Sequence, residues 1–241
     1  MRLGMHCLWI TIFVPPAVAG PTLVEDVRFI SAFAHAIDDG GSGVIDGPNI
    51  SSTPSLGAHF GGLEAANSAG GDFDAIAAAG TKQFSFFDEG GFTRFSADAI
   101  AEVVADRRNN SEQSNARAEA YIRLVFELDQ DMFFTLEGEF RTFELGGGDT
   151  NVHISLSASG AQNALFERND VGIFASSGYL EKGTWVFELL AEATASSSPS
   201  DADLLDAQAI FRDVRFTLVP APTTSVPLAL AGLVLARRRR R

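Results

Sequence analysis

Cysteine, basic residues and long apolar runs are all scarce in this 241-residue chain. The single cysteine, Cys7, lies within the first 19 residues, so the rest of the chain has no disulfide, thiol nucleophile or cysteine-based metal site. Lysine and arginine number 18 against 31 acidic residues, a net charge of −13. This charge argues against nucleic-acid binding, which needs a basic face for the phosphates. No apolar run reaches the roughly 20 residues of a membrane-spanning helix.

Established catalytic motifs are missing as well. The chain has no Gly-x-Ser-x-Gly, His-Glu-x-x-His or P-loop sequence. Beyond residue 19 its histidines are His35, His59 and His153, and no motif accompanies them that would indicate a catalytic triad. Glu137 and Glu139 share a strand face and could serve as a glycosidase pair, but any solvent-facing strand carries such residues. We therefore expect no enzyme, with a polysaccharide hydrolase as a remote alternative.

The first 19 residues have the three parts of a secretory signal peptide. Arg2 gives the positively charged start, and residues 8–14 form a short apolar stretch. Ala17 and Ala19 supply the small residues of a cleavage site before Gly20. The sequence therefore predicts export, with a signal helix that is removed.

The last 23 residues have a three-part pattern of their own: a proline-containing motif, an apolar stretch from Val226 to Ala236, and an arginine tail. The motif is Val219, Pro220, Ala221 and Pro222, and the tail is Arg237, Arg238, Arg239, Arg240 and Arg241. As a helix, the apolar stretch would be about 17 Å long, well short of a hydrocarbon core of about 30 Å. It therefore fits a transient membrane anchor better than a permanent one.

This order of parts resembles the PEP-CTERM sorting signal of bacterial exported proteins. In that family a Val-Pro-x-Pro motif precedes a short membrane segment and an arginine-rich tail, and an exosortase cuts near the motif. The chain departs from the pattern at Ala221, where glutamate is usual. The resemblance implies an exosortase-type processing enzyme as a partner, transient contact with the inner membrane, and delivery to the cell surface or the extracellular space. It divides the chain into a signal peptide (1–19), an acidic domain (20–218) and a sorting signal (219–241).

Removing both end segments makes the remaining domain more acidic. Arg2 and the five C-terminal arginines leave, so 12 basic residues face 31 acidic ones, a net charge of −19. Such a domain repels nucleic acid and anionic membrane surfaces. We expect it to contact an acidic polysaccharide only through bridging divalent cations or through local arginines.

Alternating apolar and polar residues predict antiparallel β-structure in the second half of the domain. Residues 121–128 alternate, a turn follows at 129–131, and the alternation resumes through residue 141, which indicates a hairpin. Gly146 to Asp149 predicts the next turn. Further strands are expected at 152–158, 172–175, 183–192 and 210–218, with a serine-rich loop at 195–203.

The pattern in the first half of the domain does not decide every element of secondary structure. Val27 to Ile37 alternates as a strand. Ser96 to Asp106 fits either a helix, with Ser96 as N-cap, or a strand with Phe95 and alternate residues on one face.

The domain also resembles PEP-CTERM proteins in the pattern of its strands. The similar pieces are the strand 122–128, the acidic turn after it, Leu136-Glu137-Gly138, and the segment from Gly178 to Trp185. This resemblance favours strands throughout. It predicts an all-β fold, an antiparallel β-sandwich of jelly-roll type, between the signal helix and the short C-terminal membrane segment.

A glycine-rich loop at residues 38–47 is the best candidate for a metal site. Asp38, Asp39 and Asp46 could give Ca²⁺ the carboxylate oxygens it prefers. Asp72 and Asp74, and Asp129 and Asp131, are weaker copies. A solvated acidic turn explains the same residues, so no cofactor is required and calcium is an option.

Taken together, these features predict an exported cell-surface or extracellular-matrix protein with a structural or adhesive role. The alternative is a calcium-braced carbohydrate-binding module acting on exopolysaccharide, in which Tyr121 or Tyr179 could stack on sugar rings. Trp185 lies on an apolar strand face and is expected in the core.

Overall fold

A computed structural model describes residues 20–37, 43–52, 58–69, 75–88, 92–107, 113–197 and 204–221. The strands are β1 Thr22–Ile37, β2 Gly43–Ser52, β3 His59–Ala69, β4 Ala75–Phe87, β5 Arg94–Arg107, β6 Gln113–Leu128, β7 Met132–Leu145, β8 Asp149–Ala158, β9 Phe166–Arg168, β10 Gly172–Leu180, β11 Gly183–Ser197 and β12 Leu204–Pro220. The described part of the chain contains no helix that is long and apolar enough to cross a membrane.

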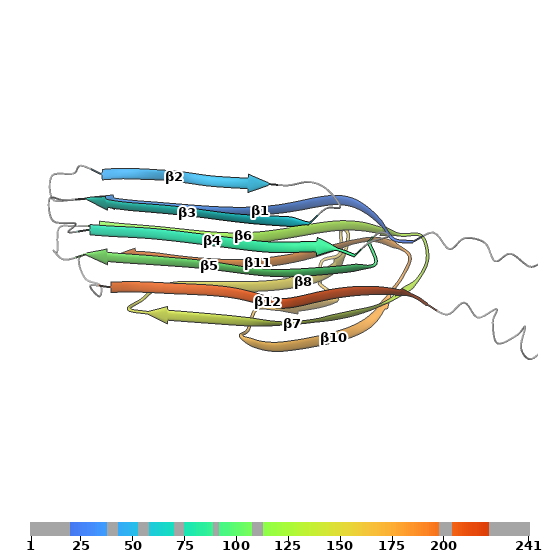
Figure 1. Ribbon diagram of the computed structural model, residues 1–241. Helices are drawn as coiled ribbons and strands as arrows, with labels where there is room; N and C mark the ends of the chain where they lie inside the picture. Colours follow the sequence, from blue (N-terminus) through green and yellow to red (C-terminus); the bar gives the residue numbers. More distant parts are fainter. Residues whose placement is uncertain are drawn as a thin grey trace, which may run out of the picture.

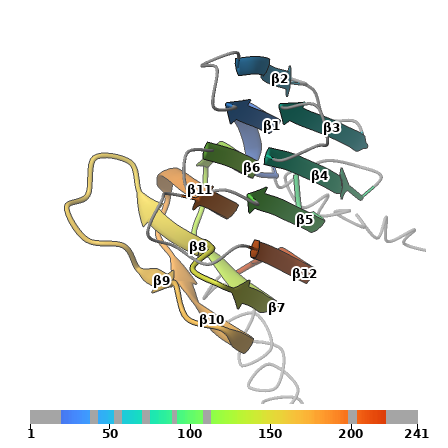
Figure 2. The same ribbon diagram turned by 90° about the vertical axis from the view of Figure 1, so that its left-hand side faces the viewer.

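The strands form two antiparallel sheets that pack face to face (Figures 1 and 2). Sheet 1 has the order β2-β1-β6-β11-β8-β9, and sheet 2 has the order β10-β7-β12-β5-β4-β3. The predicted all-β antiparallel sandwich is therefore confirmed.

Alternation along the strands decides which face is buried. In β6, Ile122, Leu124 and Phe126 are fully buried, and in β11, Trp185 and Phe187 face the same core. The open choice at Ser96–Asp106 is settled in favour of a strand, β5. Tertiary burial of its alternate apolar residues outweighs the helix propensity of alanine and glutamate.

Two sequence expectations about connections are wrong. Residues 121–128 and 132–141 do not form a hairpin, because β6 pairs with β1 and β11 while β7 pairs with β10 and β12. The short connection at 129–131 instead carries the chain from sheet 1 to sheet 2, so the two apolar faces meet across the core. The serine-rich segment also starts later than expected, since β11 continues to Ser197, whose hydroxyl lies 2.8 Å from that of Ser114.

The last eight strands form nested antiparallel pairs. β5 pairs with β12, β6 with β11, β7 with β10, and β8 with β9. These pairs alternate between the sheets, which gives β5-β12-β7-β10 in one and β6-β11-β8-β9 in the other. β1 and β2 extend sheet 1 beside β6, while β4 and β3 extend sheet 2 beside β5.

Both ends of the described chain lie at one end of the sandwich, which we call the terminal end (Figure 1). Thr22 is opposite Glu127, and Pro220 is opposite Met132, on either side of the connection at 129–131. Val219 and Pro220 of the predicted sorting motif are thus the last residues of β12, and the Ala221 N–H donates to the Asp131 carbonyl at 3.1 Å. Pro222 and the arginine tail are outside the described residues.

The core changes in composition along its length. Aromatic rings fill the half near the terminal end, and Phe216 lies among Phe92, Phe126, Phe134 and Phe187. Alanine methyl groups fill the opposite half, where the buried positions include Ala34, Ala36, Ala77, Ala105, Ala116, Ala193 and Ala195. A buried side chain stabilises the fold in proportion to its apolar area. Each residue of the aromatic half therefore contributes more hydrophobic stabilisation than each residue of the alanine half.

Candidate functional site

Near the terminal end, strands β3 and β4 turn polar side chains to the core and large apolar ones to solvent. His59, Gln83 and Ser85 point into the sandwich and are at most 4% exposed. Their neighbours Phe60 and Phe84 point outward and are 81% and 39% exposed. Buried polar groups and exposed large apolar ones both reduce folding stability, so this combination is the most informative feature of the surface.

A charged pair from sheet 1 completes the polar interior. Arg28 on β1 is fully buried and binds both carboxylate oxygens of Asp26, with Nε–Oδ1 and Nη2–Oδ2 distances of 2.8 and 2.5 Å. Its Nη1 also contacts the Ser85 hydroxyl across the core at 3.3 Å, and its guanidinium lies 4.7 Å from the ring centre of Phe87. The pair therefore ties sheet 1 to β4 of sheet 2.

His59 makes this interior sensitive to acid. Burial lowers its pKa most, the positive charge of Arg28 lowers it further, and Asp26 opposes both by raising it. The folded chain thus favours the neutral imidazole, whereas the unfolded chain binds a proton below its ordinary pKa of about 6.5.

We expect the free energy of unfolding to fall as the pH drops from about 7.5 to 5.5. His59→Gln removes this proton uptake and should reduce the loss, while His153→Gln on the outer face of β8 should leave it unchanged. Urea unfolding at both pH values measures the difference. Equal pH dependence in wild type and His59→Gln would contradict this role for His59.

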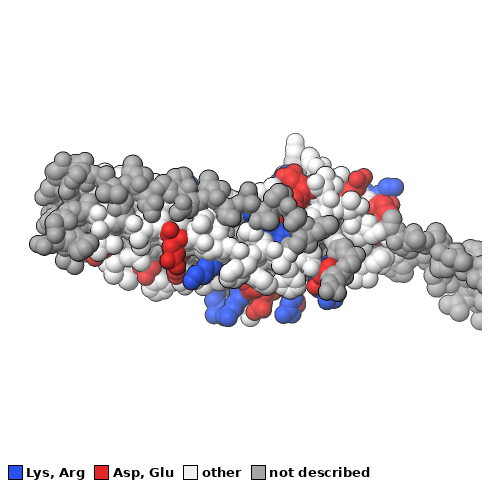
Figure 3. Space-filling view, turned by 45° about the horizontal axis from the view of Figure 1, so that its top comes forward, with Lys and Arg blue, Asp and Glu red and all other residues white. Residues whose placement is uncertain are grey.

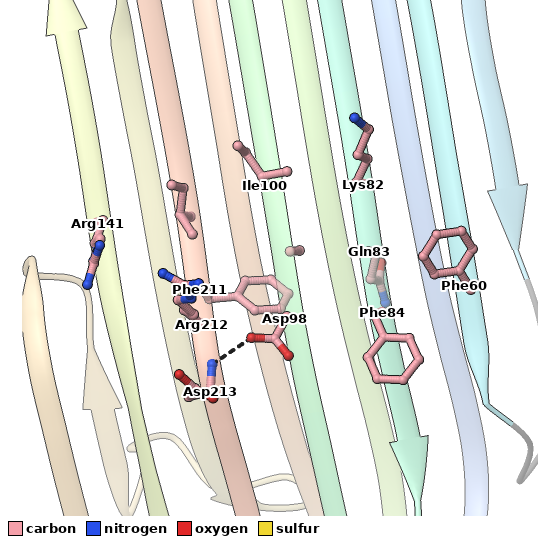
Figure 4. Close-up of a pocket in the computed structure, with 12 residues that line it drawn as sticks. Phe60, Lys82, Gln83, Phe84, Asp98, Ile100, Arg141, Phe211, Arg212 and Asp213 are labelled. Atoms are coloured by element: carbon pink, nitrogen blue, oxygen red, sulfur yellow. Dashed lines mark hydrogen bonds between the residues drawn. The ribbon is translucent and has the colours of Figure 1, made fainter.

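A groove of about 580 Å³ crosses the outer face of sheet 2 (Figure 4). It runs over β7, β12, β5, β4 and β3, a span of about 19 Å at the usual strand spacing. The Phe60 and Phe84 rings lie side by side at one end, with centroids 6.4 Å apart and an interplanar angle of 63°. Ile100 and Ile210 form the middle of the floor, and charged side chains are spaced along it: Lys82, Asp98, Arg141, Arg212 and Asp213.

A β-bulge in β12 shapes the groove. The register of β12 shifts between Phe211 and Val214, so that both point into the core although they are three residues apart. Asp213 adopts φ = 52°, and its N–H donates to Asp98 Oδ1 at 2.7 Å (Figure 4). The extra residue lets Arg212 and Asp213 both face outward, which is how bulges redirect side chains at sheet surfaces.

These groove residues were not among the sequence-based candidates. One signal was present: Gln83-Phe84-Ser85-Phe86 alternates, but it gives no indication that the polar set faces inward. The bulge did have a signal, because the buried positions of the strand are odd-numbered up to Phe211 and even-numbered from Val214, with the adjacent polar residues Arg212 and Asp213 between them.

The structure brings few of the predicted site residues together. Asp38 and Asp39 lie outside the described residues, and of Asp46 the backbone alone is described, opposite Ala34. Within the described parts of the chain, no three His, Cys, Asp or Glu side chains are grouped to hold a metal ion. Asp131 accepts hydrogen bonds from the Tyr179 hydroxyl and the Lys182 N–H, which lower its pKa and fix the turn. Calcium binding by the 38–47 loop stays a prediction.

The other candidates also have structural partners. Glu139 accepts a hydrogen bond from Arg141 at 2.7 Å, and this bond lowers its pKa, which opposes a role as a general acid. Glu137 lies 3.5 Å from Arg215 on the same face. Tyr121 donates to Glu188 at 2.8 Å on the outer face of sheet 1, and Trp185 is buried with its Nε1 donating to the Glu181 carbonyl.

No family model matches the chain, and no curated protein matches it. Among solved structures, it is similar to a chain of Broad Bean Stain Virus, with 10% identity, 89% of this chain and 96% of that one covered, and a TM-score of 0.20. It is similar to infectious bursal disease virus VP2 at 7% identity, with 94% and 90% covered and a TM-score of 0.21. A GH31 alpha-xylosidase (Xac1773) from Xanthomonas citri has 9% identity, 85% and 28% covered, and a TM-score of 0.20. At these TM-scores the similarities bear on neither the fold nor the function of the chain.

Proposed function

We propose that this chain is an exported, non-catalytic adhesive protein of the cell surface or extracellular matrix, which binds an extended polysaccharide in the groove on sheet 2. The observation that carries the proposal is the outward placement of Phe60 and Phe84 while polar residues of the same strands are buried. An exposed aromatic pair on a rigid sheet suits ligands with flat apolar faces.

A polysaccharide fits this groove in shape and chemistry. The C–H face of a sugar ring packs on an aromatic ring, and its hydroxyl groups bond to charged side chains at its edge. The groove is open and crosses five strands, so a long polymer can lie along it without its ends entering the protein. Glu139 is paired and ionised, which favours binding over hydrolysis.

Co-sedimentation of the purified protein with the producer's exopolysaccharide tests this function. Binding should be saturable, and Phe60→Ala with Phe84→Ala should weaken it at least tenfold, because each covered ring contributes about 1.5 kcal/mol or more. Phe133→Ala is the matched control, since Phe133 is also an exposed ring on sheet 2 but lies outside the groove. Equal binding by the double variant, or no binding by the wild type, would refute the proposed site. Repeating the measurement with a calcium chelator tests the calcium-braced alternative.

The proposal also covers the jelly-roll topology of the fold and the route of export. We propose a jelly roll for β5–β12, supported by the nested pairs described above, since a long hairpin rolled into two sheets has this strand order. Sorting would proceed through an exosortase-type enzyme, after transient anchoring in the inner membrane. The intact mass of protein from the cell surface tests this route, and a species that retains Arg241 would contradict it.

A further inference from the structure

The groove contains basic side chains that form no ion pair with an acidic residue. Seven arginines with described side chains have a carboxylate oxygen within 4.0 Å. Among the described basic side chains, Lys82, Arg212 and Lys182 have none, and the first two line the groove. In a chain with 31 acidic residues, unpaired cations are unexpected, and two in one groove call for an explanation.

The two cations extend from strands on either side of β5. Lys82 extends from β4 and Arg212 from the bulge of β12, with β5 between them. Their backbones are two strand spacings apart across the sheet and two residues apart along it, which together is about 12 Å. Ile100 lies between them on β5, opposite both Lys82 and Ile210 (Figure 4). Arg141 is on the far side of β12 and is already bound to Glu139. Ile100 and Ile210 thus lie between two cations that have no carboxylate oxygen within 4.0 Å, although Arg212 is opposite Glu139 on β7 and its charge helps to lower the pKa of that carboxyl.

We propose, resting on the function given above, that the polysaccharide is acidic, and that Lys82 and Arg212 bind carboxylate or sulfate groups of its sugars while Phe60 and Phe84 pack against the rings. Ion pairs and charge-assisted hydrogen bonds give these contacts their strength and specificity.

The charge of the rest of the protein limits the choice of ligand chemistry. On the face seen in Figure 3, basic side chains lie beside acidic ones and form no continuous basic surface. A highly charged polyanion such as nucleic acid would meet repulsion over most of its length. A polysaccharide with spaced acid groups can place its charges at the two unpaired cations and its hydroxyl groups elsewhere. This matches the expectation that local arginines are needed for such contact.

Matched pairs of polymers test the inference without knowledge of the natural ligand. Binding of the purified chain is measured in EDTA to polygalacturonate and its carboxyl-reduced derivative, and to dextran sulfate and dextran. We expect saturable binding to at least one acidic polymer, at least tenfold stronger than to its neutral counterpart and weakened by salt. Lys82→Gln with Arg212→Gln should remove at least tenfold of that affinity, whereas Lys182→Gln, which also removes an unpaired cation, should not. The difference between the two acidic polymers identifies carboxylate or sulfate as the preferred group.

The outcomes separate this inference from the proposed function. Equal binding to an acidic polymer and its neutral counterpart, with dependence on Phe60 and Phe84, would overturn the acidic ligand and leave the groove's function intact. Binding that needs calcium and is unchanged by the Lys82 and Arg212 substitutions would overturn the acidic ligand in the same way. Binding to the producer's matrix that is lost on protease treatment of the matrix would indicate a protein ligand and overturn both. Absence of binding to every polymer, including the producer's own, would also overturn both.

Discussion

Asp26→Ala is expected to destabilise the folded chain by about 3–5 kcal/mol, because it leaves the fully buried guanidinium of Arg28 without its anionic partner. The side chains of Arg28 and Asp26 are 0% and 5% exposed, so solvent cannot replace the lost contact. The contacts of Arg28 with the Ser85 hydroxyl and the Phe87 ring carry no full negative charge. Chemical denaturation at neutral pH measures the loss.

Two further variants distinguish a buried ion pair from ordinary packing. Arg94→Ala breaks the exposed pair with Asp88 and should cost no more than about 1 kcal/mol. Replacing both members of the buried pair, Asp26→Leu with Arg28→Met, should cost much less than Asp26→Ala, because no unpaired charge remains. If Asp26→Ala and Arg94→Ala have similar effects, the pair does not act as a buried ionic contact.

Phe216→Ala is expected to cost about 3–5 kcal/mol for a different reason: it opens a cavity at the centre of the aromatic half of the core. The Phe216 ring is 5.1 Å from that of Phe187 and 5.7 Å from that of Phe126, measured between centroids. Neighbours on both sheets pack against it, and they cannot close the space without moving their strands.

The exposed ring of Phe143 provides the comparison. Phe143 lies on the outer face of β7 and is 51% exposed, so Phe143→Ala should change the free energy of unfolding by less than about 1 kcal/mol. Thermal or urea unfolding of the two variants checks both values. A loss at Phe216 as small as that at Phe143 would mean that the core tolerates the deletion by local collapse.

The sequence predicts strands and buried faces well where apolar and polar residues alternate in the ordinary sense. Residues 121–128 alternate in sequence, and Ile122, Leu124 and Phe126 are buried, because the period of two leaves a strand one way to bury its apolar face. Which strands pair with each other is predicted less well. The hairpin expected around 129–131 is a crossing between sheets, since a short turn is compatible with either geometry and distant strands decide between them.

The candidate site could not be predicted from the sequence, because contacts between distant strands form it. His59 and Ser85 are acceptable inside because Arg28 and Asp26 from β1 lie nearby, and that proximity is set by the fold and not by local sequence. Lys82 and Arg212 are 130 residues apart in sequence and share a groove through the order β12-β5-β4. A pattern within one strand carries no information about such neighbours.

The position of β12 has a mechanical consequence. This strand ends at the terminal end with Pro220, passes beneath the groove, and is hydrogen-bonded to β5 on one side and β7 on the other. Its hydrogen bonds lie perpendicular to the strand, as in any antiparallel ladder. Under the proposed function, a pull between Ala221 and a polymer in the groove would load both ladders in shear, so that many hydrogen bonds would have to break at the same time. The sheet resists force best in this direction, along its strands.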